Sequence, residues 1–255
     1  MLTSSSGSSM DVVAKLSDFG FAKDCSHDSQ STLSAEYVTD DSNWMAPELL
    51  FPQNASEETD IYSLGCVYFY TLTHGAYFKT NSGALSSRKD HLSMLACALI
   101  GRMTKHEAGN RISSQDVTRN PLFWNADKVL NFIVDVSNRL ENREMNEEIR
   151  EEIRYIEADV VRENWYTKLD TPVVDALKAR RSYDGSSMQD LVRAIRNLRL
   201  HYDVCSAEFR RFVGKLPEEY LNYWLRLFPN LVLSLYIIAD RHLSQDITFH
   251  NLYLK

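Results

Sequence analysis

The sequence predicts a mainly α-helical protein, and three observations support that prediction. Apolar residues recur at the three- and four-residue spacing of amphipathic helices in most segments after residue 59. Several of these segments begin with the Ser, Asp or Pro residues that start helices. Alternating strand patterns are nearly absent after residue 20. The 255 residues, 44% hydrophobic and 25% charged, have the composition of an ordinary globular protein with one large domain or two modest ones.

The expected strand, loop and helices follow one another along the chain, separated by polar segments and helix-capping residues. Residues 1–11 are rich in Ser and predict a disordered N-terminus, residues 12–16 predict a short strand, and residues 24–43 predict a long polar surface loop. Helices are expected over residues 59–73, 92–103, part of 111–123, 128–140, 146–161, 173–181, 188–202, 220–227 and 229–242. The first of these is so apolar that we expect burial on most sides. Ser113 or Ser114 would cap the helix within residues 111–123.

The helix expected after Ser187 separates two chemically different faces. Ser187, with Asp190 three residues later, resembles a capping box. One stripe is apolar and predicts burial: Met188, Leu191, Val192, Ile195, Leu198 and Tyr202. The opposite face is polar and carries Arg193, Arg196, Asn197 and His201. We therefore expect a guanidinium, an amide and an imidazole on one solvent-facing surface, where they could hold a phosphodiester and move a proton.

The charge distribution limits how this protein could bind a nucleic acid. A net charge of -7 argues against a general nucleic-acid coat protein, so any RNA contact should use a local basic patch. Residues 178–215 provide one, with nine Lys and Arg against four Asp and Glu, and a solvated helix face is the alternative interpretation. The candidate RNA-binding residues in this patch are Lys178, Arg181, Arg193 and Arg199.

The cysteines and the apolar stretches indicate whether the protein is secreted, crosses a membrane or lies in a reducing compartment. The four cysteines have no paired spacing, which favours a reducing compartment over a disulfide framework or a zinc site. The N-terminus has no basic region followed by an apolar core, so it does not resemble a secretory signal. The most apolar stretch, residues 221–239, is interrupted by polar residues and is expected to be buried helix and not a membrane span.

An ordered series of motifs occupies the first half of the chain. Asp18-Phe19-Gly20 is followed by Ala46-Pro47-Glu48, then by Asp60-Ile61-Tyr62-Ser63-Leu64-Gly65, and Arg111 precedes Asn120-Pro121-Leu122-Phe123-Trp124. The series resembles the C-terminal lobe of a protein kinase from its magnesium-binding turn onward.

The kinase resemblance implies roles for four residues. Asp18 would be the metal-ligating Asp, Asp60 would anchor the core of the lobe, and Glu48 would form a structural ion pair with Arg111. The sequence has no Gly-rich loop, no strand lysine and no His-Arg-Asp catalytic loop before residue 18. We therefore expect a truncated kinase lobe without phosphoryl transfer of its own, and an active kinase is the least favoured interpretation. ATP and Mg²⁺ would be cofactors only of a full-length relative.

The second half completes a more specific resemblance. Residues 121–124 lead into Asp135-Val136-Ser137-Asn138-Arg139, and the segments 190–197 and 228–231 follow. Together they resemble the inositol-requiring kinase/endoribonuclease family, the unfolded-protein-response sensors of the endoplasmic reticulum. The interferon-linked latent ribonuclease shares the nuclease domain but fits less well, because the motifs at 18–20 and 46–48 are intact here. The expected domains are 1–11, disordered; 12–123, a partial kinase C-lobe; and 124–255, an all-helical kinase-extension nuclease domain.

The family resemblance implies a metal-independent ribonuclease that uses no cofactor. Such an enzyme cleaves RNA by attack of the neighbouring 2′-hydroxyl and leaves a cyclic phosphate and a 5′-hydroxyl. Arg196 would clamp the scissile phosphate, and Asn197 would position the ribose or phosphate. His201 would protonate the leaving 5′-oxygen, and Tyr183 would take or orient the 2′-hydroxyl proton. The family usually has two adjacent histidines here, and Leu200 replaces the first of them.

The resemblance also implies partners and a location. RNA is the expected substrate, and activity in the family needs side-by-side dimers, formed through kinase-lobe and nuclease surfaces with a second copy or a full-length relative. With no membrane span of its own, the chain would lie in the cytoplasm, at the cytosolic face of the endoplasmic reticulum if it is part of a longer protein. The alternative is a catalytically silent module that binds and regulates a full-length kinase/ribonuclease.

Overall fold

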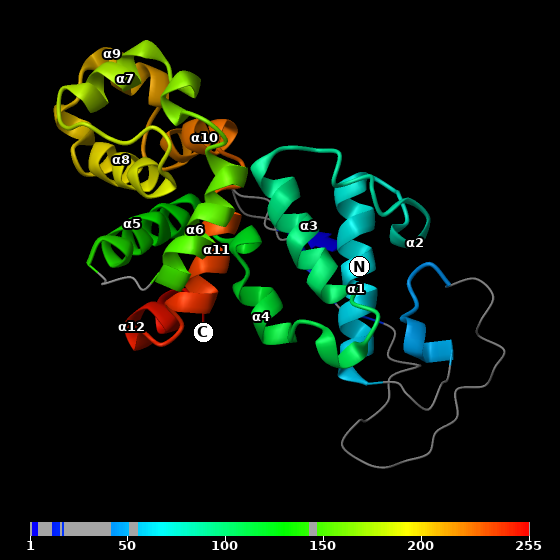
Figure 1. Cartoon of the computed structure of the whole chain (residues 1–255). Coiled ribbons are helices and arrows are strands. Elements are labelled where there is room, and N and C mark those ends of the chain that lie inside the picture. Colours follow the sequence, from blue (N-terminus) through cyan, green and yellow to red (C-terminus); the bar gives the residue numbers. More distant parts are fainter. Residues whose placement is uncertain are drawn as a thin grey trace.

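The computed structural model describes residues 2–4, 12–15, 17, 42–50, 56–142 and 147–254. The structure is mainly α-helical, as predicted, and its helices form two groups that follow the chain (Figure 1). The first group belongs to residues before 124, and the second comprises everything from residue 126 onward.

Two short strands precede the helices. β1 (Leu2–Ser4) pairs antiparallel with β2 (Val12–Ala14), and Thr3 lies opposite Val13. The strand expected near residue 12 is therefore present, but the prediction of disorder throughout residues 1–11 is wrong for Leu2–Ser4. The backbone of β2 offers an open edge, and three residues of the N-terminus pair with it despite the Ser-rich composition.

The first helical group is built on two long helices, α1 (Glu57–Thr73) and α3 (His91–Met103), which pack against each other. Shorter elements surround them: η3 (Pro47–Leu50), α2 (Phe78–Asn81), η5 (Ala108–Asn110), α4 (Ser114–Arg119) and η6 (Pro121–Phe123). Polar side chains fix the helix starts, because the Asp90 carboxylate accepts from the Ser93 N–H and the Ser113 hydroxyl accepts from the Asp116 N–H. Of the two predicted caps, Ser113 is the one used.

Burial of α1 differs from the prediction. Its face toward α3 is buried at Ile61 and Phe69, but Leu64, Val67 and Tyr70 remain exposed, Val67 by 45%. The expectation of burial on most sides is wrong, because apolar density does not say how many neighbours a helix has. Here α3 and the segment around Ala46 cover one side of α1.

The second group contains most of the buried apolar core. Its elements are α5 (Ala126–Asn142), α6 (Glu147–Val160), η7 (Trp165–Lys168), α7 (Thr171–Lys178), α8 (Met188–Leu200), η8 (Tyr202–Val204), α9 (Ala207–Val213), α10 (Glu218–Leu227), α11 (Leu231–His242), α12 (Ile247–Phe249) and the π-helical turn η9 (His250–Leu254). α5 packs against α8, and α11 packs against both α5 and α6. No helix was expected at α9, which is short.

One apolar core joins these helices. The stripe predicted for α8 is buried at Met188, Leu191, Val192, Ile195 and Leu198. Burying such large apolar side chains contributes about 1.5–3 kcal/mol each, so the stripe alone is a major part of the stability of this half. Because this stripe must face the core, α8 cannot rotate about its own axis, and the direction of its polar face is fixed.

The two groups meet through α3, α11 and the turn after η6. Trp124 lies between them, and its ring contacts Phe132 of α5 at 5.1 Å and Tyr236 of α11 at 6.0 Å between centroids. His91 at the start of α3 contacts the Pro229 carbonyl at 3.3 Å. Among the helices of the described part, none is both long and apolar enough to cross a membrane.

Candidate functional site

α8 is held at its start, its middle and its end. The Ser187 hydroxyl accepts from the Asp190 N–H at 3.2 Å, and Glu157 of α6 accepts the N–H of Met188. In the middle, the buried Tyr220 hydroxyl donates to the Ile195 carbonyl at 2.8 Å. The expected reciprocal half of the capping box is not formed, because the Asp190 carboxylate accepts from the Asp184 N–H instead. The polar face of α8 is therefore held at a fixed orientation toward α5.

The loop before α8 presents Tyr183 and is clamped by Trp165. The indole N–H donates to the carbonyls of Asp184 and Ser187, at 3.0 and 3.1 Å, and the Trp165 backbone N–H donates to Gly185. The loop lies so close to Asn164 that a Cβ at Gly185 would come within 2.2 Å of the Asn164 Oδ1. Neither Trp165 nor Gly185 is marked as a site residue by the apolar periodicity or the motifs of the sequence. A Gly just before a helix cap was the available signal.

Three of the predicted site residues form one hydrogen-bond chain. The Asn197 amide donates from Nδ2 to the Tyr183 hydroxyl at 3.0 Å. The Arg196 Nε donates to Asn197 Oδ1 at 3.2 Å. Tyr183 and Arg196, at the two ends of this series, are largely buried, and Asn197 between them is half-buried.

Arg196 differs from the expectation of a solvent-facing guanidinium. The residue is only 9% exposed, and its Nη1 donates to Asn138 at 2.9 Å and to Glu141 at 2.5 Å, both on α5. The long side chain lies across α8 and turns its charge toward the neighbouring helix, where a carboxylate offsets the cost of burial. Arg196 donates to Glu141, and this bond, more than any other contact, lowers the pKa of the Glu141 carboxyl.

His201 lies one turn beyond Asn197, at the C-terminal cap of α8, and is exposed. Its backbone N–H donates to the Asn197 carbonyl at 3.2 Å, and its carbonyl accepts from the Cys205 thiol at 3.3 Å. Residues four apart lie on the same face of a helix, so His201, as the C-cap, follows Asn197 on the same side of α8. No hydrogen bond joins the imidazole to the other three site residues within the part of the chain described.

The candidate RNA-binding cations fall into two classes. Lys178 and Arg181 are exposed at and after the end of α7, and neither has an ion-pair partner among the residues described. Arg199 donates to Asn131 of α5 at 2.8 Å. Arg193 is held by two carboxylates, Glu141 and Asp190, which makes it a structural group in this conformation.

Leu200, where the family resemblance leads us to expect a second histidine, is 65% exposed. This expected departure therefore lies at the surface, one residue before His201, and it does not disturb the core. An apolar group at this place cannot donate to a phosphate or a base.

In the first helical group, Glu48 and Arg111 form a bidentate ion pair. Arg111 Nη1 and Nη2 each donate to a carboxylate oxygen of Glu48 at 2.7 Å, and the arginine side chain is fully buried. The bonds from Arg111 lower the pKa of Glu48 to about 2. Asp60 is exposed, one residue beyond Thr59, whose hydroxyl donates to Glu48 at 3.0 Å, and its anchoring role stays a prediction. Asp18 lies outside the described residues.

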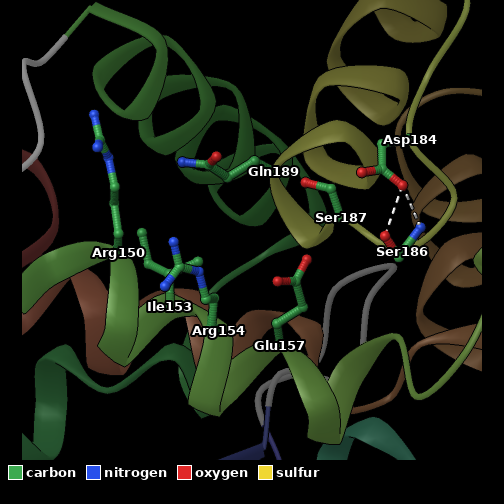
Figure 2. A pocket seen from close by; sticks show the side chains of 8 residues that line it. All are labelled: Arg150, Ile153, Arg154, Glu157, Asp184, Ser186, Ser187 and Gln189. Atoms are coloured by element: carbon green, nitrogen blue, oxygen red, sulfur yellow. Dashed lines mark hydrogen bonds between the residues drawn. The ribbon is translucent and has the colours of Figure 1, made fainter. Parts of the chain in front are cut away.

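In the second helical group, a pocket of about 270 Å³ lies between α6 and the start of α8 (Figure 2). Arg150 and Arg154 line it from α6 together with Glu157, and Asp184 and Ser187 line it from the other side. None of Tyr183, Arg196, Asn197 and His201 contributes to its walls. The two arginines of its wall are paired with Glu147, its wall also carries two carboxylates, and Glu157 already accepts the first N–H of α8, so the pocket offers little to an anion. Within the described ranges, no group of three His, Cys, Asp or Glu side chains could hold a metal ion.

Comparison with known proteins places each half in a family. Residues 2–123 match the family described as protein kinase domain, and residues 129–253 match the family described as ribonuclease 2-5A. The sensor for unfolded proteins in the ER of Schizosaccharomyces pombe is 31% identical over 278 aligned residues, covering 96% of this chain and 26% of that protein. The chain belongs to the kinase/endoribonuclease family of unfolded-protein sensors.

Other members of this kinase/endoribonuclease family show the same coverage. A human serine/threonine-protein kinase/endoribonuclease is 33% identical over 86% of this chain and 25% of its own length. One from Arabidopsis thaliana is 32% identical over 92% of this chain and 28% of its own length. The chain thus spans about a quarter of the length of the curated relatives it matches, and it carries sequence from both the kinase and the ribonuclease domains.

Proposed function

We propose that this chain is an endoribonuclease that cleaves stem-loop RNA by attack of a 2′-hydroxyl and needs no metal ion. The observation that carries the proposal is the hydrogen-bonded series Tyr183, Asn197 and Arg196, with the exposed His201 one turn further along the same helix. These groups come from a loop and one helix that are themselves rigidly held. A phenol, an amide, a guanidinium and an imidazole suffice for phosphodiester transfer without a Lewis acid.

Each group has a defined task in the proposed reaction. The ribose 2′-oxygen attacks phosphorus, the bond from phosphorus to the 5′-oxygen breaks, and a 2′,3′-cyclic phosphate forms. His201 gives its proton to the leaving 5′-oxygen, which becomes a hydroxyl. Tyr183 takes or orients the proton of the 2′-hydroxyl. Arg196 stabilises the charge that develops on the phosphate, and Asn197 positions it.

The surface around this site fits an RNA backbone. Lys178 and Arg181 are exposed near Tyr183 in sequence and are free of ion pairs among the described residues, so they can contact phosphates. Arg199 can add a further contact if it leaves Asn131. Two copies side by side would extend this basic surface, and we propose that cleavage is dimer-dependent and takes place at the cytosolic face of the endoplasmic reticulum when the chain is part of a longer protein.

The test uses His201→Ala, with His106→Ala as the matched control because His106 is exposed and far from the site in sequence. Synthetic stem-loop RNAs are incubated with the purified chain in the presence of a chelator, and products are identified by mass. We expect His201→Ala to lower the cleavage rate about 10²- to 10⁴-fold. A single 2′-deoxy substitution at the scissile nucleotide should block cleavage, and His106→Ala should change nothing.

Two outcomes would reject the assignment: full activity in His201→Ala, or complete dependence on magnesium. Sedimentation across concentration, run beside the cleavage assay, separates the alternative function. A chain that cleaves no RNA at any concentration but binds a full-length kinase/endoribonuclease would be the silent regulatory module instead.

A further inference from the structure

The carboxylate of Glu141 joins two arginines of α8. It stands in the last turn of α5, where Oε2 accepts from Arg196 Nη1 at 2.5 Å and Oε1 accepts from Arg193 Nε. Each of the three side chains is about three-quarters shielded from solvent or more. Their attraction is therefore screened less than that of a surface ion pair.

The hydrogen bonds of Arg196 account for three of its five N–H donors. Nη1 uses both hydrogens, on Asn138 and Glu141, and Nε uses its one hydrogen on Asn197. Nη2 has no partner among the described residues, and it is not among their buried polar atoms that lack one. The guanidinium is thus fixed along its inner edge, and Nη2 remains to meet a substrate. A bidentate clamp on phosphate would need a second free edge, which this arrangement does not offer.

The fixed guanidinium also determines which way the Asn197 amide faces. Arg196 Nε can only donate, so the amide must turn its oxygen toward it. The amide nitrogen then points at the Tyr183 hydroxyl, whose oxygen accepts. Tyr183 consequently keeps its own proton free to donate away from Asn197. The residues that hold Arg196 therefore set the orientation of the phenol, first through Arg196 and then through Asn197.

We propose that Glu141 is a positioning residue for RNA cleavage: it acts through Arg196 and Asn197 on Tyr183, and it touches no substrate. The proposal rests on the endoribonuclease activity proposed above. The helix dipole disfavours a carboxylate in the last turn of a helix. The two arginines of α8 offset this cost for Glu141 and hold its carboxylate in place. Asn138, one turn earlier on α5, supports the same Nη1 group.

The kinetic test compares Glu141→Gln with the unsubstituted chain. Gln keeps the shape and one acceptor, but its NH₂ faces one of the two guanidinium groups, where two donors oppose each other. We expect kcat on a stem-loop RNA to fall about 10- to 100-fold, with KM changed less than about threefold, since misplacement of a reacting group costs rate more than binding. Glu147→Gln is the control, because Glu147 makes only exposed ion pairs on α6, and it should leave both constants unchanged.

Two further measurements distinguish positioning from general stability. In an Arg196→Ala background, under single-turnover conditions, Glu141→Gln should change the rate less than about twofold, because the group it acts through is gone. By NMR, the Arg196 Nε–H should be protected from exchange in the unsubstituted chain and lose at least about tenfold of that protection in Glu141→Gln but not in Glu147→Gln.

The outcomes that overturn the proposal are separate from failure of the activity itself. A kcat in Glu141→Gln within about twofold of the unsubstituted chain would overturn it, as would the same loss in the presence and absence of Arg196. Unchanged Nε–H protection would overturn it also. If the chain cleaves no RNA, the proposed function fails, whereas the NMR result still decides whether Glu141 fixes Arg196.

Discussion

Removing the charge of Glu48 should cost the first helical group a large part of its stability. The Arg111 guanidinium is fully buried, and Glu48 is only 14% exposed, so Glu48→Gln would leave a buried cation with a neutral partner. The Gln NH₂ would also face guanidinium donors where the carboxylate now accepts two bonds of 2.7 Å. Breaking a buried pair by removing one partner costs about 3–5 kcal/mol.

The pKa of Glu48 gives a second route to the same magnitude. The bonds from Arg111 lower this pKa from 4.5 to about 2. At about 1.4 kcal/mol per pKa unit, the difference corresponds to roughly 3 kcal/mol. A lowered carboxyl pKa stabilises the fold above the unfolded value of 4.5, and the contribution disappears as the pH falls through 4.5 toward 2. The stability difference between the original chain and Glu48→Gln should therefore shrink to about half or less by pH 3.

The assay is hydrogen exchange of the α1 and α4 amides by mass spectrometry, with urea unfolding by circular dichroism beside it. Local exchange is preferred because the two helical groups need not unfold together. Glu147→Gln, at an exposed ion pair, is the control and should cost less than about 1 kcal/mol. A cost below about 1 kcal/mol for Glu48→Gln at pH 7, or a cost that does not decline between pH 7 and pH 3, would refute the reasoning.

Three further predictions concern the second helical group. Gly185→Ala places a Cβ within 2.2 Å of Asn164 Oδ1, so it should destabilise by about 1–3 kcal/mol in thermal unfolding, and Asn164→Ala should restore most of the loss by making room. Tyr220→Phe leaves the buried Ile195 carbonyl without its hydroxyl donor and should cost about 1–3 kcal/mol in urea unfolding, whereas an unchanged midpoint would argue against that bond. Because Arg196 lowers the pKa of Glu141, the contact between them should persist above the ordinary carboxyl range and weaken as the pH falls through the lowered pKa, which NMR titration of the Glu141 carboxyl can follow.

Periodicity was sufficient to predict the buried side of α8. Met188, Leu191, Val192, Ile195 and Leu198 all lie in the core, because an apolar stripe on a helix has no better place in water than a neighbouring apolar surface. The same reasoning failed for α1. There the apolar residues exceed what its neighbours cover, and Val67 stays exposed. Composition gives the tendency to be buried, but the number of packing partners is a property of the whole fold.

Periodicity also could not predict the environment of Arg196. The pattern assigns the Cα position to the polar side of α8, whereas the guanidinium lies several bonds away and can reach a different surface. Its partners, Asn138 and Glu141, belong to a helix that only the tertiary packing brings beside it. The available signal was on α5 itself: an acid in the last turn opposes the helix dipole and implies a cation nearby. This acid and the arginines of α8 together are the sequence signal for the pairing of the two helices.

This pairing changes what the polar face of α8 can do. Of the three groups expected to face solvent together, the imidazole of His201 is exposed, the amide of Asn197 is bonded to the phenol of Tyr183, and the guanidinium of Arg196 is held by α5. A fixed inner edge on the guanidinium lowers the entropy lost when Nη2 meets a phosphate. The arginine therefore contributes to the proposed site through its immobility as much as through its charge, and Lys at this position, a point charge on a flexible stem, could not replace it.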